Sequence, residues 1–205
     1  MPREGVLEDQ PIMTDEEARR IIPAAPEWFG TIVALTIILG LRISETLALR
    51  VRDLDFSRKI IHVRQSIDAV TREPHAVKSK ASRADLPMPS WLEQRLRKHL
   101  QTHDGKTDFL FVNGRGRPHS ANKLREKVLH PLLAKLGIPR KGFHSMRHGA
   151  SSSLLDDGAT PAVVQKQLRH SDARTTLSIY GHVVGNSQRN AVENRSARIG
   201  QFAAK

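Results

Sequence analysis

The chain has 205 residues, which is enough for one domain of ordinary size with tails and too short for two large independent domains. It contains no cysteine, which excludes disulfides and thiolate metal sites, and its 39% hydrophobic and 4% aromatic residues favour a helix-rich protein over a β-sandwich. Thirty-three Lys and Arg against 21 Asp and Glu give a formal net charge of +12, which indicates a nucleic-acid partner or, as an equal alternative, a surface charge that only keeps the protein soluble.

The N-terminal part predicts a tail followed by a short helix. Residues 1–11 are polar, contain Gly and Pro, and lack the apolar core of a secretory signal, so we interpret them as a tail or the remnant of a linker. Thr14 and the three acids after it are typical of a helix start, because such side chains bind free backbone N–H groups. We expect this helix to run to Ile22 and to end at Pro23.

A second helical stretch is expected over residues 28–50, with a break near Gly40. The part before this glycine is apolar nearly all round, which is typical of a central buried helix. Its most apolar run, Phe29 to Leu41, has about 13 residues and is too short to cross a membrane.

Residues 60–65, 76–78 and 84–88 predict short strands of a small antiparallel sheet, because β-branched residues there are bounded by turn-prone or charged segments.

Helices are expected again in the second half of the chain. Leucines four apart over 92–100 and a longer apolar stripe over 124–136 each predict a helix that faces the core. The Thr-Pro pair at 160–161 predicts the start of a helix that runs to Leu168, and another short helix is expected over 175–180.

The last twenty residues are polar with scattered apolar side chains, namely Val192, Ile199 and Phe202. A frayed tail and a segment that packs on a neighbouring protomer explain this pattern equally well.

Four clusters contain the residues that could carry chemistry. They are G-L-R-I-S-E at 40–45, K-S-K-A-S-R at 78–83, H-S-M-R-H at 144–148, and L-R-H-S-D-A-R-T-T-L-S-I-Y at 168–180.

Each cluster, taken alone, has an ordinary structural explanation. Arg42 and Glu45 have the spacing of an ion pair on a helix surface, and the lysines near residue 80 suit a charged turn. His144 and His148 have metal-ligand spacing without an evident third ligand, and Tyr180, the only tyrosine, could be a packed ring with a bonded hydroxyl.

Taken together, the clusters predict metal-free nucleophilic attack on a phosphodiester. Arginines bind the non-bridging oxygens with forked, charge-assisted hydrogen bonds and stay protonated while negative charge accumulates there. Histidines add hydrogen bonds or move protons near neutral pH, a lysine protonates the leaving 5′-oxygen, and a tyrosine supplies the nucleophile. Covalent attachment to the tyrosine conserves the bond energy, so DNA can be rejoined without ATP.

At these residues the chain resembles the tyrosine recombinase, or phage integrase, family from about Thr14 to His182. The resemblance implies an α+β, mainly helical catalytic domain with a small antiparallel β-sheet that carries a β-hairpin. It also implies six catalytic residues and two supporting ones. The catalytic residues are Arg42, Lys80, His144, Arg147, His170 and Tyr180, with Lys78 as an alternative to Lys80, and the supporting residues are Glu45 and His148.

Two features depart from the family pattern. Arg169 stands where the family usually has glycine, which implies a changed local backbone or an added phosphate contact, and we expect Arg169 and Arg83 to contact DNA. We expect no counterpart here of the family's N-terminal core-binding domain. We therefore expect an isolated catalytic fragment or a naturally short relative, with the catalytic domain at 12–184, a tail at 185–205, and weak, salt-sensitive binding of DNA.

The function implied by the resemblance is site-specific recombination through a 3′-phosphotyrosine intermediate, without a metal or another cofactor. We expect double-stranded DNA as the partner, a homo-oligomer when assembled on DNA, and no membrane. Integration or excision of a phage or mobile element is the expected role, in a cytoplasmic, nucleoid-associated protein of a prokaryote or phage. Two alternatives stay open: a DNA-binding module without independent turnover, and a metal-dependent hydrolase built on the histidines.

Overall fold

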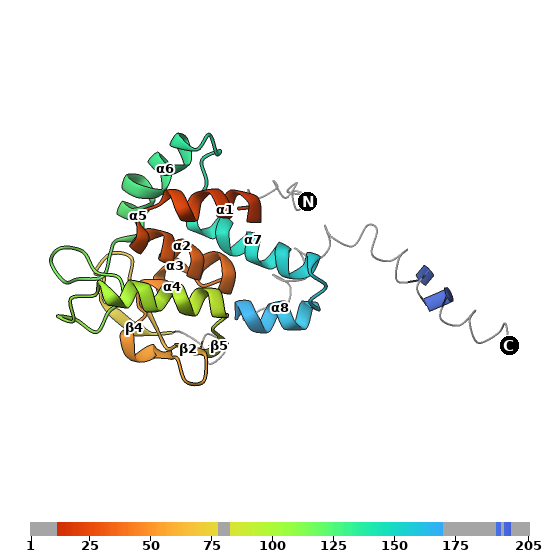
Figure 1. Ribbon diagram of the computed structural model, residues 1–205, viewed down its shortest axis with the longest axis horizontal. Helices are drawn as coiled ribbons and strands as arrows, with labels where there is room; N and C mark the ends of the chain where they lie inside the picture. The colour runs from red at the N-terminus through yellow and green to blue at the C-terminus, as the bar shows by residue number, and fades with distance from the viewer. Residues whose placement is uncertain (1–11, 78–82, 170–191, 194, 198–205) are drawn as a thin grey trace, which may run out of the picture.

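The computed structural model describes residues 12–77, 83–169, 192–193 and 195–197 (Figure 1). Its first helix, α1 (Asp15–Ala24), begins with the expected cap. The Glu17 N–H donates to Thr14 Oγ1 at 3.1 Å, and the Thr14 N–H donates to Glu17 Oε2 at 2.9 Å. This reciprocal pair satisfies backbone donors that the first turn leaves free. The helix ends two residues beyond the predicted Ile22, with Pro23 in its last turn.

Helix α2 (Glu27–Leu39) is buried along almost its whole length and ends at Gly40, whose φ of 63° is left-handed. A one-turn helix, α3 (Ile43–Thr46), follows directly. The predicted break at Gly40 is therefore confirmed. It turns the chain so that Arg42 lies at the start of α3.

The strands form two small antiparallel sheets. A 3₁₀ turn, η1 (Val51–Asp53), leads into β1 (Leu54–Asp55), which pairs with β2 (Ile60–Val63), and β2 pairs with β5 (Ala84–Pro87). A separate pair is made of β3 (Gln65–Ile67) and β4 (Pro74–Ala76).

The antiparallel arrangement is confirmed, but the predicted strands 60–65 and 76–78 are wrong in extent. The first strand is divided at Arg64 into β2 and β3. The Arg64 side chain donates to the Val63 and Ala84 carbonyls at this division. The second strand is displaced to β4, which pairs with β3 and not with β5.

The second half of the chain is helical. Helix α4 (Ser90–Gln101) buries Leu92 and Leu96. The predicted stripe over 124–136 is one helical run composed of α5 (Ala121–Leu124), a π-helical turn η3 (Arg125–Leu129) and α6 (His130–Lys135). Pro131 explains the π turn, since it has no N–H to donate to the carbonyl four residues earlier.

Two further helices complete the described part of the domain, α7 (Phe143–Asp156) and α8 (Pro161–Leu168). The predicted cap of α8 is confirmed, because the Val163 N–H donates to Thr160 Oγ1.

Helix α2 lies in the middle of the helical layer, with α1, α4 and α7 against it (Figure 1). Its side chains Phe29, Ile32 and Leu35 are fully buried in the main core. A second, smaller core joins α7 to α8 through Ala150, Leu155, Val164 and Leu168. Among the described residues, no helix has the length and apolar character that crossing a membrane requires.

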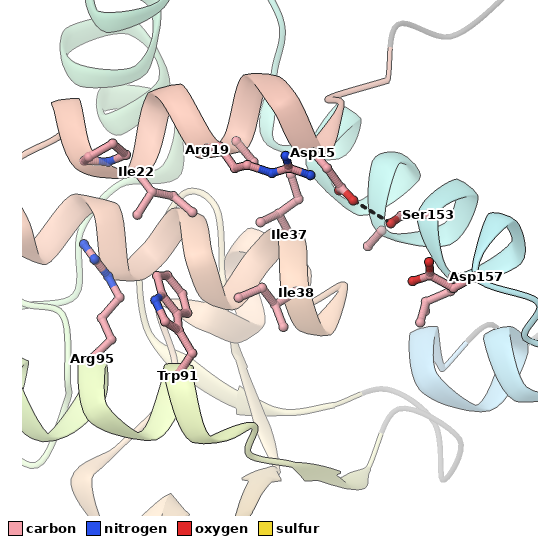
Figure 2. A pocket seen from close by; sticks show the side chains of 13 residues that line it. Asp15, Arg19, Ile22, Ile37, Ile38, Trp91, Arg95, Ser153 and Asp157 are labelled. Carbon is pink, nitrogen blue, oxygen red and sulfur yellow. Dashed lines mark hydrogen bonds between the residues drawn. The ribbon is translucent and has the colours of Figure 1, made fainter.

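A groove of about 710 Å³ lies between α1, α4 and α7 (Figure 2). Its lining is mainly apolar, and Trp91 on α4 is half exposed there. At one end Ser153 Oγ donates to Asp15 Oδ2 at 2.9 Å and joins α7 to α1. Among the residues that the structure describes, none of the site residues predicted from the sequence lines this groove.

Candidate active site

Arg42 is held by Glu45 at the first turn of α3. Its backbone N–H donates to Glu45 Oε2 at 2.8 Å, and its Nη1 donates to Glu45 Oε1 at 2.9 Å. The Arg42 side chain is 37% exposed, whereas the Glu45 side chain is 2% exposed. The ion pair expected from the spacing is present, but it is not a surface pair. One face of Arg42 is anchored to a buried carboxylate while the side chain keeps access to solvent.

Arg147 lies in the first half of α7 and is only 6% exposed. Its Nη1 donates to the Gly40 carbonyl and its Nη2 to the Leu168 carbonyl. These carbonyls stand at the ends of α2 and α8, and Gly40 is 107 positions from Arg147 in the sequence. Two of the five guanidinium donors are used in this way. These two hydrogen bonds fix the plane of the guanidinium between the C-terminal ends of α2 and α8.

The structure brings Arg42 and Arg147 together at the Gly40 turn. Burial and the neighbouring charges of Arg42 and Arg169 together lower the pKa of Arg147 to about 9, against the opposing charge of Glu45. A group with this pKa is still a cation at neutral pH. The described part of the chain therefore presents two adjacent, fixed positive charges.

Arg169 differs from the sequence expectation. It was predicted to contact DNA, but it is 2% exposed, and its Nη2 lies 2.7 Å from Glu45 Oε2. Its Nη1 donates to the Gln167 carbonyl at 2.8 Å. Like Arg147, Arg169 is thus a buried guanidinium that protein acceptors orient. The phosphate contact expected of Arg169 therefore stays a prediction, whereas the changed backbone is present as a left-handed φ of 58°.

His144 and His148 both lie on α7, with ring centroids 6.3 Å apart. His144 is exposed and His148 is half-buried. Burial lowers the pKa of His148, and the neighbouring His144 and Arg147 lower it further, so His148 is neutral at neutral pH. Within the described ranges, no three His, Cys, Asp or Glu side chains gather as a metal site would require.

The remaining predicted catalytic residues lie outside the described residues. They are Lys80 with its alternative Lys78, His170 and Tyr180. The described residues stop at Val77 before the lysines, resume at Arg83, and break off again at Arg169, directly before His170.

Arg83 is exposed at the start of β5 and borders a groove of about 1160 Å³ between β5 and α8. Two further basic residues line this groove that were not predicted from the sequence, namely Arg64 and Lys166. Lys166 is exposed on α8, three residues before Arg169. The spacing of Lys166 and Arg169 on a helix was a usable signal, but which of the two is exposed depends on the fold.

Comparison with known proteins places these features in a family context. The family model described as the phage integrase family matches residues 11–186. The tyrosine recombinase XerC-like protein of Caldanaerobacter subterraneus subsp. tengcongensis is 28% identical over 217 residues, covering 94% of this chain and 55% of that protein. Tyrosine recombinase XerA of Thermococcus onnurineus is 31% identical over 188 residues, covering 88% and 61%. The chain spans a little over half the length of these curated relatives.

Solved structures share the fold. The Tn1549 transposon integrase, in complex with transposon right end DNA, superposes with a TM-score of 0.80 at 22% identity, covering 94% of this chain and 68% of that one. The XerA recombinase crystal structure gives a TM-score of 0.71 at 24% identity, covering 95% and 66%. The expected α+β, mainly helical architecture is thereby confirmed.

Proposed function

Because this chain belongs to the phage integrase family of tyrosine recombinases, we propose that it cuts and rejoins double-stranded DNA through a covalent bond between Tyr180 and a DNA 3′-phosphate. The observation that carries the proposal is the meeting of Arg42 and Arg147. Arg42 follows Gly40 by two residues, and Arg147 donates to the Gly40 carbonyl. Two adjacent guanidiniums are suited to bind the two non-bridging oxygens of one phosphate.

In the proposed reaction the Tyr180 hydroxyl gives its proton to one of the site histidines, His144 or His170, or to water, and its oxygen bonds to phosphorus. The bond from phosphorus to the 5′-oxygen breaks, and this oxygen takes a proton from Lys80, or from Lys78 in its place, to leave a free 5′-hydroxyl. The reverse steps rejoin a strand, since a 5′-hydroxyl attacks the phosphotyrosine and the tyrosine regains its proton. The phosphotyrosine bond conserves the energy of the broken phosphodiester, so rejoining the strand needs no external source of energy.

Arg42 and Arg147 stabilise the charge that grows on the non-bridging oxygens in the transition state. Arg147 suits this role because its two carbonyl contacts orient the guanidinium before DNA arrives. His144 is exposed beside it and would donate a hydrogen bond to the phosphate, together with His170. His148 is the neutral neighbour that supports His144. Glu45 acts through Arg42, which it fixes at two points.

The proposed path of the DNA passes Arg83 and the groove between β5 and α8, where Lys166 adds positive charge and Arg64 is paired with Asp85. The proposed setting is the cytoplasm of a prokaryote, with several copies assembled on DNA to bring two duplexes together. The likeness to a transposon integrase solved with its DNA favours integration or excision of a mobile element, and the likeness to XerA is compatible with it.

The experiment that tests this function traps the covalent intermediate. The protein is incubated with a pool of duplex oligonucleotides that have a randomised core and one nick, so that the short cleaved fragment diffuses away. The expected product is a protein–DNA adduct that resists denaturation and whose attached 3′ end can be sequenced. A Tyr180→Phe variant supplies the matched control, because it lacks only the nucleophilic oxygen.

An adduct from the wild-type protein that is lost in Tyr180→Phe and persists with a chelator supports the proposal. An equal adduct from Tyr180→Phe contradicts it. DNA binding without any adduct favours the alternative of a binding module without turnover. Cleavage that a chelator abolishes favours the metal-dependent hydrolase.

A further inference from the structure

Arg169 occupies an unusual backbone position. It caps α8 with φ 58° and ψ 42°, and its N–H donates to the Lys166 carbonyl at 3.3 Å. Glycine adopts this left-handed conformation freely, whereas a residue with a side chain is strained by it. A strained arginine at this position persists when the fold gains something from its side chain.

The side chain of Arg169 reaches the same carboxylate that holds Arg42. Its Nη2 lies 2.7 Å from Glu45 Oε2, and this oxygen also accepts the backbone N–H of Arg42. Both partners of the Arg169–Glu45 pair are buried, with side chains 1% and 2% exposed. Charge-assisted bonds of this kind are strong and directional when water is excluded. The orientation of Glu45 is therefore set from two sides.

The same turn also holds Arg147, since its Nη2 donates to the carbonyl of Leu168, the residue before Arg169. The end of α8 thus contacts Arg42 through Glu45, and Arg147 directly. In the described part of the chain, the charged groups that face Glu45 are Arg42, Arg169 and Arg147. One carboxylate balances three cations.

We propose that Arg169 is a positioning residue: through its ion pair with Glu45 it holds Arg42 in place for the phosphate and ties this arginine to the turn that binds Arg147. The inference rests on the proposed function and goes beyond it, because it assigns a role in the reaction to a buried residue that acts through its ion pair with Glu45.

The test uses the whole chain and the nicked oligonucleotide pool described above. Arg169→Gly removes the ion pair and suits the left-handed backbone, and Arg169→Lys keeps a cation. Arg72→Gly is the matched control, because Arg72 also has a positive φ, of 61°, but lies in the turn between β3 and β4. Circular dichroism of each variant checks folding before the assay. The measurements are the rate of adduct formation at saturating DNA, the DNA affinity, and the pH dependence of the rate.

The expected result is a rate about 10- to 100-fold lower for Arg169→Gly, since small displacements of an oriented group have effects of this size. DNA affinity should change far less, Arg169→Lys should recover part of the rate, and Arg72→Gly should match the wild type. The acid side of the pH profile should move to higher pH in Arg169→Gly, because Glu45 loses a cation that favours its charged form. In a Glu45→Gln background, Arg169→Gly should have little further effect.

The outcomes separate the two levels of inference. A wild-type protein that forms no adduct overturns the proposed function, and the role of Arg169 with it. An adduct that Arg169→Gly forms as fast as the wild type, with an unshifted pH profile, overturns the positioning role alone. If Arg169→Gly lowers the rate by the same factor in the wild-type and in the Glu45→Gln background, the positioning role is overturned as well.

Discussion

Gly40 and Leu168 approach so closely that a Cβ on Gly40 would lie 2.0 Å from Leu168 Cδ2. The contact joins the break between α2 and α3 to the end of α8, the two places whose carbonyls bind Arg147. A side chain at Gly40 would also be strained by its φ of 63°. The close approach therefore fixes the distance between the two halves of the candidate site.

Gly40→Ala should lower the free energy of unfolding by about 3 kcal/mol, through backbone strain and overpacking together. Denaturant titration of both variants measures the difference. Gly137→Ala is the matched control, because Gly137 has a similar φ of 65° with nothing within 4 Å of the added Cβ, and its cost should be only about 1 kcal/mol. If the two substitutions lowered the free energy of unfolding equally, the Leu168 side chain would have to move away from the added Cβ at no energetic cost.

Glu45→Gln should make stability less dependent on pH in the acid range. Burial raises the pKa of Glu45, but the charge of Arg169 and the N–H and charge of Arg42 outweigh it, so the pKa lies below the ordinary 4.5. The carboxylate thus stabilises the fold fully above pH 4.5, and this contribution is lost as the pH falls through the lower, folded-state pKa.

The expected cost of Glu45→Gln is about 3 kcal/mol at pH 7, because the buried Arg169 and the partly exposed Arg42 lose their partner, and the cost should shrink as the pH falls through the lowered pKa of Glu45. Thermal unfolding followed across the acid range measures it. Glu73→Gln is the control, since Glu73 forms an exposed ion pair with Arg117 at 3.0 Å, for which we expect less than about 1 kcal/mol. A pH-independent cost for Glu45→Gln would contradict the ionised state assigned here.

Local signals in the sequence predict the helices well. The caps at Thr14 and Thr160 and the break at Gly40 depend on backbone groups within one turn, so the residues that decide them are adjacent in the chain. Strand pairing depends on distant segments. The segment near Ala76 was therefore recognised as a strand, but its partner, β3, was not.

The same distinction applies to the candidate site. The family pattern selects Arg42 and Arg147, and the fold brings them together. The burial of Arg169 and its ion pair with Glu45 could not be predicted, because Glu45 is 124 positions away and the depth of burial depends on the packing of the whole fold. A basic residue in a motif for a DNA enzyme suggests a phosphate contact until its environment is known.

Gly149→Ala should destabilise the protein, although the helix propensity of alanine alone predicts the opposite. Alanine is favoured over glycine by about 1 kcal/mol inside a helix, but a Cβ at Gly149 would lie 2.0 Å from the Met13 carbonyl oxygen. The Met13 N–H donates to the Ser145 carbonyl at 2.9 Å, so the segment before α1 is tied to α7 and cannot easily move away.

We expect a net loss of about 2 kcal/mol for Gly149→Ala, measured by denaturant titration. Ser151→Ala on the same helix is the control. Its hydroxyl is buried without a hydrogen-bond partner among the described residues, so its removal should leave stability equal or higher. A stabilised Gly149→Ala would show that the Met13 segment moves aside at no cost.

Neutralising the groove between β5 and α8 should weaken DNA binding and reduce its dependence on salt. Arg83 and Lys166 are exposed at this groove, and each cation that contacts a phosphate releases counterions, which steepens the plot of log affinity against log salt by about 1. Replacing both with Gln should therefore lower the slope by about 2 without a change in sequence preference.

Fluorescence anisotropy with a random-sequence duplex at several salt concentrations measures the slope. Lys135→Gln removes a charge that is also exposed, but on α6 and away from the groove, and should leave the slope unchanged. If the double Gln variant kept the wild-type slope, the DNA would have to pass over another face, because the electrostatic contribution of a phosphate contact cannot persist after its charge is removed.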